Sequence, residues 1–393
     1  MKLLPLFCAF LVTSAFAAEG PTVAILPVPG GGIQPQVAVD QDEVVHLVYF
    51  KGAPAHGDIF YVRSRNDGAT FSEPVRVNSQ AGSAVAAGTI RGAQLAVGQR
   101  GRVHVVWNGS TKAALRGPLN PEMAQDNPHN GLPLLYSRTN DSGDGFEPAR
   151  NLMTRTFGLD GGAAVAADQD GRVYVGWHAS SEGALKGEAG RQVWIARSVD
   201  EGQSFSTEQP AFNQSTGTCA CCGMALHLDP SGHLYSLYRS AREVVHRDVY
   251  LLFSETGDKP FRGRRLHEWE IGACPVSSMV LVPSESGLMA AWETESQVYF
   301  ASIAGGSLDS SDPKRPSGEA RQRKHPRIAR DRYGQTLLVW AEVPGWGQEG
   351  TLAWQTFDTD GVSVLRGVSK VSLSAWSFGA AFPRSQGGFV VVQ

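Results

Sequence analysis

The chain has 393 residues, a formal net charge of −3 and 19% charged residues. This composition gives no basic surface for nucleic acid and no cationic anchor for an acidic membrane, so neither class of partner is expected. Forty-five glycines and 22 prolines predict frequent turns and few helices.

Residues 1–17 have the layout of a secretory signal peptide. Lys2 precedes an apolar run over residues 3–12, and the small residues around Ala17 fit a cleavage site. Cys8 lies inside the apolar run and would be removed with it. No later apolar run approaches the ~18 residues of a membrane span. We therefore expect a secreted or periplasmic protein whose four remaining cysteines lie where disulfides persist.

One apolar pattern ending in an aromatic residue recurs along the chain. The copies are "VHLVY" (45–49), "VHVVW" (103–107), "VYVGW" (173–177), "LYSLY" (234–238), "LMAAW" (288–292) and "LLVW" (337–340). Each follows a turn, such as "DQDG" at 168–171, and each turn follows a strand of small apolar residues. A third strand comes after a loop, as in "QVWIARS" at 192–198. Repeats of this kind, with four antiparallel strands apiece, are typical of a β-propeller.

Counting the innermost strands predicts seven blades, with six as the alternative. The last repeat, at 379–393, supplies only two strands, so "TVAILPV" at 22–28 is expected to complete that blade and close the ring. Closure removes edge strands that would otherwise pair with other chains. No linker or composition shift is visible, so residues 21–393 are expected to form a single all-β domain.

Three of the third strands run into the motif Ser/Thr-x-Asp-x-Gly-x-x-aromatic. Its residues are Ser64, Asn66, Gly68 and Phe71 in the first copy, Thr139, Asp141, Gly143 and Phe146 in the second, and Ser198, Asp200, Gly202 and Phe205 in the third. The acidic side chain, replaced by Asn66 in the first copy, should accept hydrogen bonds from the turn, while glycine takes a positive φ and the aromatic packs between sheets. The copies resemble the Asp-box, or BNR, repeats of sialidase-like propellers. The resemblance implies a structural role, on the face opposite the usual binding site.

The same resemblance implies a sialidase active site to compare with this chain. In that family a Tyr beside a Glu acts as nucleophile, an Asp acts as acid/base, and three arginines hold the substrate carboxylate. The first of those arginines lies in a Phe/Tyr-Arg-Ile-Pro motif in the first blade, where this chain has Gln34 and Gln36. Arg91, Arg239 and Arg327 are the alternative triad by position.

Polar residues are expected to gather on one face, here called the top face, where the innermost strands begin and the aromatic strands end. The candidate ligand-binding residues are Arg91, Asp160, His178, Arg239, Arg242, Asp248, Glu293 and Arg327. Such a ring suits a polar ligand, and the alternative is solvated loop ends and salt bridges between blades.

These patterns predict a secreted propeller that binds a glycan or another small polar ligand on its top face without the usual sialidase catalytic set. The alternatives are an exo-α-sialidase or related glycoside hydrolase with a divergent arginine triad, and an enzyme of another chemistry on the same scaffold. No cofactor is expected, and the protein is expected to be a monomer.

The four remaining cysteines lie in two loops that enter neighbouring blades. Cys219, Cys221 and Cys222 lie in "TCACCG", and Cys274 lies in "WEIGACP". Together with the arginines between them, these stretches resemble a recurrent group of secreted bacterial sialidase-like propellers.

Three chemistries are open to these four sulfurs. Two disulfides fit the oxidising compartment, and a bridge to Cys274 would stabilise the fold by roughly 2 to 4 kcal/mol, although four cysteines permit three pairings. A metal site is the second alternative, with Cu(I) favoured because C-x-C-C is tight for zinc. A reactive thiol is the third.

Overall fold

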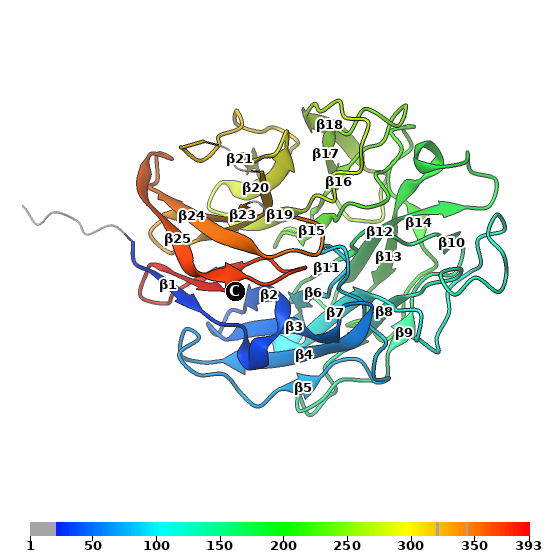
Figure 1. The fold of residues 1–393 in the computed structure, drawn as a ribbon, viewed down its shortest axis with the longest axis horizontal. Helices are drawn as coiled ribbons and strands as arrows, with labels where there is room; N and C mark the ends of the chain where they lie inside the picture. Colours follow the sequence, from blue (N-terminus) through cyan, green and yellow to red (C-terminus); the bar gives the residue numbers. More distant parts are fainter. Residues whose placement is uncertain (1–20, 320–321, 343–344) are drawn as a thin grey trace, which may run out of the picture.

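The computed structural model describes residues 21–319, 322–342 and 345–393. The signal peptide expected at residues 1–17 lies outside them. The described residues form 27 β-strands in seven sheets and three short 3-10 helices, at Pro29–Gly31, Gln99–Gly101 and Glu188–Gly190. The sheets are arranged as blades around a common axis (Figure 1). The predicted all-β propeller and its seven blades are confirmed.

The first four blades follow one another along the chain. Blade 1 has β2 (Ile33–Val39), β3 (Val45–Ala53), β4 (His56–Ser64) and β5 (Val75–Arg76), and blade 2 has β6 (Gln94–Val97), β7 (Val103–Asn108), β8 (Leu134–Arg138) and β9 (Arg150–Asn151). Blade 3 has β11 (Ala164–Ala167), β12 (Val173–Ser181), β13 (Gln192–Ser198) and β14 (Gln209–Pro210), with β10 (Thr156–Phe157) paired to the end of β12. Blade 4 has β15 (Ala225–Leu228), β16 (Leu234–Arg239), β17 (Val249–Ser254) and β18 (Arg262–His267).

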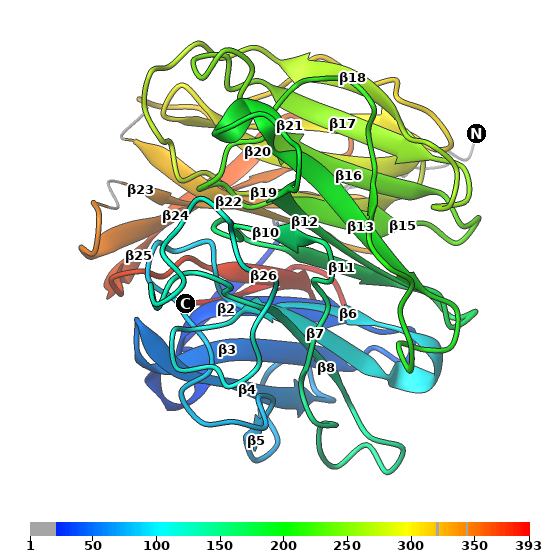
Figure 2. The same ribbon diagram turned by 90° about the vertical axis from the view of Figure 1, so that its right-hand side faces the viewer.

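The last three blades complete the circle. Blade 5 has three strands, β19 (Met279–Ser284), β20 (Gly287–Thr294) and β21 (Gln297–Ala304), and blade 6 has β22 (Arg323–Arg330), β23 (Thr336–Glu342), β24 (Gly350–Phe357) and β25 (Ser363–Leu373). Blade 7 has β26 (Ala380–Pro383), β27 (Phe389–Val392) and β1 (Val23–Leu26). Turned by 90°, the molecule shows β15 to β18 on the opposite side of the ring from β2 to β5 (Figure 2).

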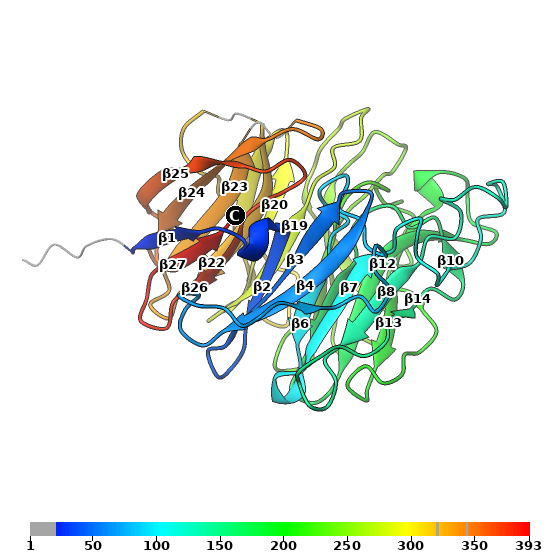
Figure 3. The same ribbon diagram turned by 60° about the horizontal axis from the view of Figure 1, so that its bottom comes forward.

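The N-terminal strand closes the ring, as expected, and it does so in parallel. β1 pairs with β27 in the register Val23↔Phe389 to Leu26↔Val392, and the two strands lie beside β26 in Figure 3. Beyond the strands, Val28 N donates to Gln393 O at 2.8 Å and Gln393 N donates to Leu26 O at 2.9 Å. The two ends of the domain therefore stabilise one blade jointly.

Small residues and one repeated turn set the geometry near the axis. The seven innermost strands line a central channel of about 460 Å³ with residues such as Ala96, Ala166 and Ala329. Aspartate begins the turn after several of these strands: Asp168 Oδ1, for example, accepts from Asp170 N at 3.0 Å and from Arg172 N at 2.9 Å. This pattern recurs at Asp40, Asp229 and Asp331. A side-chain acceptor thus fixes each tight turn.

The first and third Asp-boxes have the same hydrogen-bond pattern. In the third, Ser198 Oγ donates to Asp200 Oδ1 at 2.6 Å and accepts from Gly202 N at 2.8 Å, while Asp200 Oδ1 accepts from Ser204 N at 2.9 Å. In the first, the Asn66 amide oxygen takes the place of the carboxylate and accepts from Thr70 N at 2.9 Å. The box aromatics link blades: Phe205 lies 4.9 Å from the Tyr136 ring of the preceding blade, in an edge arrangement.

The second Asp-box corrects the expectation that each acidic side chain holds its own turn. Here the turn closes one residue earlier, because Gly143 N donates to Asn140 O at 3.1 Å. Asp141 is exposed and accepts from Arg102 at 2.8 Å. Phe146 nevertheless packs edge-on against Tyr61 of blade 1, 5.5 Å between ring centroids. The aromatic contact between blades is thus kept where the turn chemistry changes.

None of the described residues belongs to a helix long and apolar enough to cross a membrane.

The third Asp-box predicts an unequal effect of two substitutions at Asp200. Asp200→Ala removes the acceptor of Ser198 and Ser204 and should lower the free energy of unfolding by about 1 to 2 kcal/mol. Asp200→Asn should cost clearly less, because Asn66 makes the equivalent bonds in blade 1. Urea unfolding of both variants at pH 7 tests this, and equal losses would contradict it.

The same carboxylate predicts a pH effect. Although burial opposes it, hydrogen bonds from Ser198 and Ser204 lower the pKa of Asp200 to about 2. Its stabilisation is therefore present above the unfolded pKa, near 4, and is lost as the pH falls towards 2. In urea unfolding at a series of pH values, the stability gap between wild type and Asp200→Asn should shrink over that range; a gap that stays constant would contradict the assignment.

Candidate functional site

A pocket of about 190 Å³ lies on the top face. It is lined by Thr89, Cys274, Pro275, Val276, Lys324, His325, Gly345, Trp346, Gln348, Gly350, Leu373, Ser374, Trp376 and Ser377. These residues belong to the loops that enter blades 2, 5 and 7 and to the top of blade 6. Blades 2 and 5 are not neighbours, so the pocket lies across the opening of the ring. We call it the axial pocket.

Two tryptophans form one wall of the axial pocket. Trp346 is 66% exposed, and its ring lies edge-on to that of Trp376, with 4.7 Å between centroids and an interplanar angle of 90°. Lys324, His325 and Gln348 add polar groups to the lining. An apolar ring presented to solvent beside convergent polar groups is the usual composition of a small-ligand site.

Four residues of the axial pocket adopt left-handed backbone conformations. Their φ angles are 68° at Thr89, 46° at Val276, 53° at His325 and 63° at Trp376. Residues other than glycine rarely adopt left-handed backbone angles. For β-branched residues such as Thr89 and Val276, this conformation costs energy. Strained residues of this kind cluster at functional sites.

Gln34 makes hydrogen bonds to the backbone or side chains of residues in and near this strained part of the axial pocket. Its side-chain amide donates to Trp376 O at 2.7 Å and to Ala86 O at 2.6 Å, and its backbone N–H donates to Ser377 Oγ at 3.0 Å. Gln34 and His325 each precede a proline at a bulge in an innermost strand. The pairs "QP" at 34–35 and "HP" at 325–326 are the sequence signal that marks these two bulges.

The structure assigns each arginine of the expected triad to protein partners. Arg239 is buried, and its guanidinium donates to Ser277 Oγ at 2.7 Å and to the carbonyl oxygens of Arg247 and Glu293. Arg91 donates to Asp160 Oδ1 at 2.5 Å and to the Asp160 carbonyl oxygen at 2.8 Å.

Arg327 lies 4.3 Å over the ring of Phe378 and donates to Pro326 O at 2.9 Å. None of the three arginines is among the residues that line the axial pocket as described. They act as links between loops and blades, which is the structural alternative to a carboxylate clamp.

The other expected ring residues are likewise engaged in the structure. His178 Nε2 donates to Cys222 O at 2.7 Å, and burial, together with the charge of Arg191, lowers the pKa of His178 to about 4. Asp248 is buried and accepts from Trp269 N at 3.1 Å. Arg242 lies towards solvent and pairs with Glu243 at 3.2 Å.

Glu293 is the ring residue with the most unusual carboxyl group. It is 2% exposed, its Oε1 lies 3.5 Å from Lys324 Nζ, and Lys324 lines the axial pocket. Burial raises the pKa of Glu293 to about 7, with Lys324 and Arg239 acting in the opposite direction. A carboxyl group with this pKa can hold or release a proton near neutral pH.

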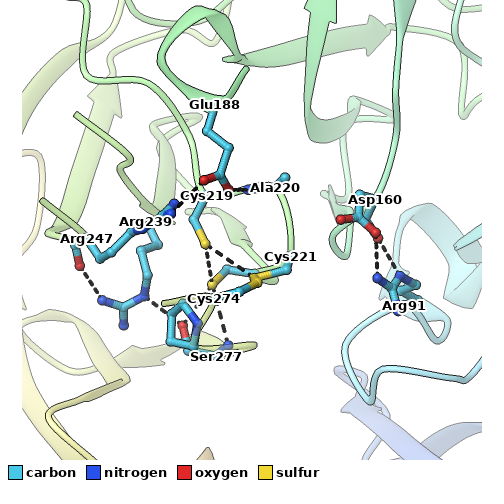
Figure 4. Close-up of a disulfide and its surroundings, with 12 residues drawn as sticks. Arg91, Asp160, Glu188, Cys219, Ala220, Cys221, Arg239, Arg247, Cys274 and Ser277 are labelled. Atoms are coloured by element: carbon cyan, nitrogen blue, oxygen red, sulfur yellow. Dashed lines mark hydrogen bonds and ion pairs between the residues drawn. A yellow bond between two sulfur atoms is a disulfide. The ribbon is translucent and has the colours of Figure 1, made fainter. Parts of the chain in front are cut away.

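The cysteines form one cluster between blades 4 and 5 (Figure 4). Of the two disulfides that were expected, the structure forms Cys221–Cys274, while Cys219 and Cys222 are buried thiols. The sulfur atoms of Cys219, Cys221 and Cys222 lie within 4.8 Å of one another, so an open disulfide would leave ligands for a soft metal ion. Cys219 and Cys222 are also separated by two residues, which is a common ligand spacing in zinc sites.

The raised pKa of Glu293 predicts how the stability of the protein changes with pH. A carboxyl group with a raised folded-state pKa stabilises the fold fully below its unfolded pKa, and this contribution is lost as the pH rises through 7. Glu293→Gln should therefore gain stability relative to wild type between pH 5 and pH 8, by up to about 3 kcal/mol. Urea unfolding over this range measures the change; Glu285→Gln, in an exposed turn of the same blade, serves as the control. A difference that does not vary with pH would contradict the assignment.

No protein-family model matches the sequence, and no curated protein matches it. Among solved structures, a Hadza microbial sialidase is 12% identical over 87% of this chain and 74% of its own, with a TM-score of 0.50. An α-L-arabinofuranosidase of Fusarium graminearum, solved with arabinobiose, is 11% identical over 87% of this chain and 98% of its own, with a TM-score of 0.52. A protein of unknown function from Dyadobacter fermentans is 12% identical over 89% of this chain and 97% of its own, with a TM-score of 0.52. The chain thus has the sialidase-like β-propeller fold that its Asp-boxes predicted.

Proposed function

We propose that this protein is secreted or periplasmic and binds a sugar unit, or a polar molecule of similar size, in the axial pocket. The observation that carries the proposal is the exposed ring of Trp346, held against Trp376 at the opening of the propeller. An aromatic ring offers a flat apolar face for the C–H side of a sugar, and the polar groups beside it suit the hydroxyls.

The size of the axial pocket favours a single sugar unit. Its volume of about 190 Å³ is below the range of ~300–1,000 Å³ that is usual for drug-sized ligands. Lys324 is the one charged residue in its lining as described. Because Glu293 lies 3.5 Å from Lys324, the net charge that a ligand meets depends on whether Glu293 is protonated. The lining therefore suits neutral sugars and singly anionic ones.

The occupied arginines favour binding over sialidase chemistry. A sialidase clamp needs free guanidinium groups aimed at one carboxylate, whereas Arg91 and Arg239 donate to Asp160 and to backbone carbonyl groups. Glycoside hydrolysis is the second candidate, favoured by one observation, the carboxyl group of Glu293 with a pKa of about 7 behind Lys324. Lys324 and Glu293 would then be the first residues to examine for proton transfer.

Glycan binding by the mature protein tests the proposal, with N-acetylneuraminic acid, arabinobiose and a glycan array as probes. Trp346→Ala should weaken the binding of any sugar found by at least tenfold, because it removes the stacking surface while leaving the blades intact. Tyr333→Ala is the matched control, since Tyr333 is 62% exposed in the turn between β22 and β23 and should leave binding unchanged. Calorimetric titration measures the dissociation constants.

Hydrolysis of a fluorogenic sialoside and a fluorogenic arabinofuranoside distinguishes the two candidates. Binding without turnover above the blank supports the proposed function, and turnover that is lost in Glu293→Gln supports the hydrolase. If no sugar binds, or if Trp346→Ala binds as tightly as wild type, the axial pocket is not the sugar site.

A further inference from the structure

The four cysteines form a continuous path of sulfur atoms from the surface to the interior. Cys274 is exposed at the rim of the axial pocket and is bonded to Cys221, which is 6% exposed. Cys219 Sγ lies 3.6 Å from Cys221 Sγ and 3.0 Å from Cys222 Sγ. Cys219 and Cys222 are each 1% exposed, so Cys274 is the most exposed of the four cysteines.

The inner end of this path is built to hold a thiolate. The Ser277 backbone N–H and hydroxyl donate to Cys222 Sγ at 3.5 and 3.3 Å, and the Arg239 guanidinium donates to the same hydroxyl at 2.7 Å. Although burial opposes it, the hydrogen bond from Cys219, the charge of Arg239 and the Ser277 donors lower the pKa of Cys222 to about 6. The hydrogen bond between the two sulfur atoms, together with burial, raises the pKa of Cys219.

We propose that these cysteines form a thiol–disulfide exchange relay, in which the exposed Cys221–Cys274 disulfide exchanges with the buried Cys219/Cys222 dithiol. The C-x2-C spacing of the inner pair and the contact between Cys219 and Cys221 are the geometry that such an exchange needs. The proposal does not rest on sugar binding, although Cys274 is shared with the lining of the axial pocket.

The first half of the exchange needs no external oxidant. Cys219 passes its proton to the Cys222 thiolate and attacks Cys221 Sγ, which forms a Cys219–Cys221 bond and releases Cys274 as a thiolate. Cys222 then loses its proton to Cys274 or to solvent and attacks Cys219 Sγ, which forms the Cys219–Cys222 disulfide and releases Cys221. One disulfide and two thiols are present before and after, so atoms and electrons balance.

The second half connects the chain to an external disulfide. The thiols of Cys221 and Cys274 reduce the external disulfide to two thiols. In the same step the Cys221–Cys274 disulfide forms again. The chain then carries two disulfides, and an external dithiol reverses the sequence. The partner class is therefore a dithiol or disulfide that reaches Cys274 at the top face.

Oxidation by glutathione disulfide tests the relay in the mature protein. The formation of Cys219–Cys222 is followed by acid quenching, alkylation and peptide mapping by mass spectrometry. In Cys221→Ser/Cys274→Ser the inner pair has no exposed partner, so its oxidation should be at least tenfold slower than in wild type. An equal rate would overturn the relay.

Ser277→Ala provides a second readout that a merely structural role would not move. It removes the hydroxyl that donates to Cys222, so the pH midpoint of the exchange rate should move upward. Ser374→Ala, in the lining of the axial pocket, is the control and should leave the midpoint unchanged. A midpoint that is the same in Ser277→Ala and wild type would overturn the role assigned to Cys222.

If the double variant does not fold, disulfide mapping of the wild-type protein by mass spectrometry still tests the relay. Protein with one disulfide, kept without oxygen, should contain both Cys221–Cys274 and Cys219–Cys222 molecules in exchange. A single unchanging pairing, or four free thiols that hold a stoichiometric metal ion, would overturn the relay.

Discussion

The parallel pairing of β1 with β27 is the constraint on which the rest of the structure depends. The blades are consecutive along the chain, so a ring exists only if the last blade is completed by residues from the first end. Closure places the loop before blade 2 opposite the loop before blade 5. The axial pocket takes residues from both loops, and it is therefore a product of ring closure rather than of any single blade.

Arg239 shows how a residue expected to bind a ligand can instead hold the structure together. Its position at the end of an aromatic strand would let it face the opening of the ring, yet its guanidinium is buried and donates to Ser277 and to two carbonyl groups. These bonds tie β16 to the loop that enters blade 5 and hold Ser277 against Cys222. An arginine that the sequence placed in a candidate carboxylate clamp thus supports the cysteine cluster here.

The sequence was sufficient for the architecture because the determinants of the blades are local. Turns with Asp168, the aromatic strands and two of the three Asp-boxes behave as their residue types predict. The second Asp-box differs because Asn140 competes with Asp141 for the start of the turn. The candidate site was harder to predict. Trp346 and Trp376 lie in two separate loops next to blade 6, and no repeat or motif indicates that their rings meet. The left-handed conformations at Thr89 and Val276 likewise have no signal in the residue types. The partners of Arg239 and the choice of Cys221 as the partner of Cys274 depend on packing between blades.

A crystal structure of the protein with a bound sugar tests most directly whether the axial pocket is the ligand site of this propeller. We expect the sugar ring to lie against Trp346, with its hydroxyls towards Lys324 and Gln348. A sugar bound elsewhere, with the axial pocket empty, would contradict it.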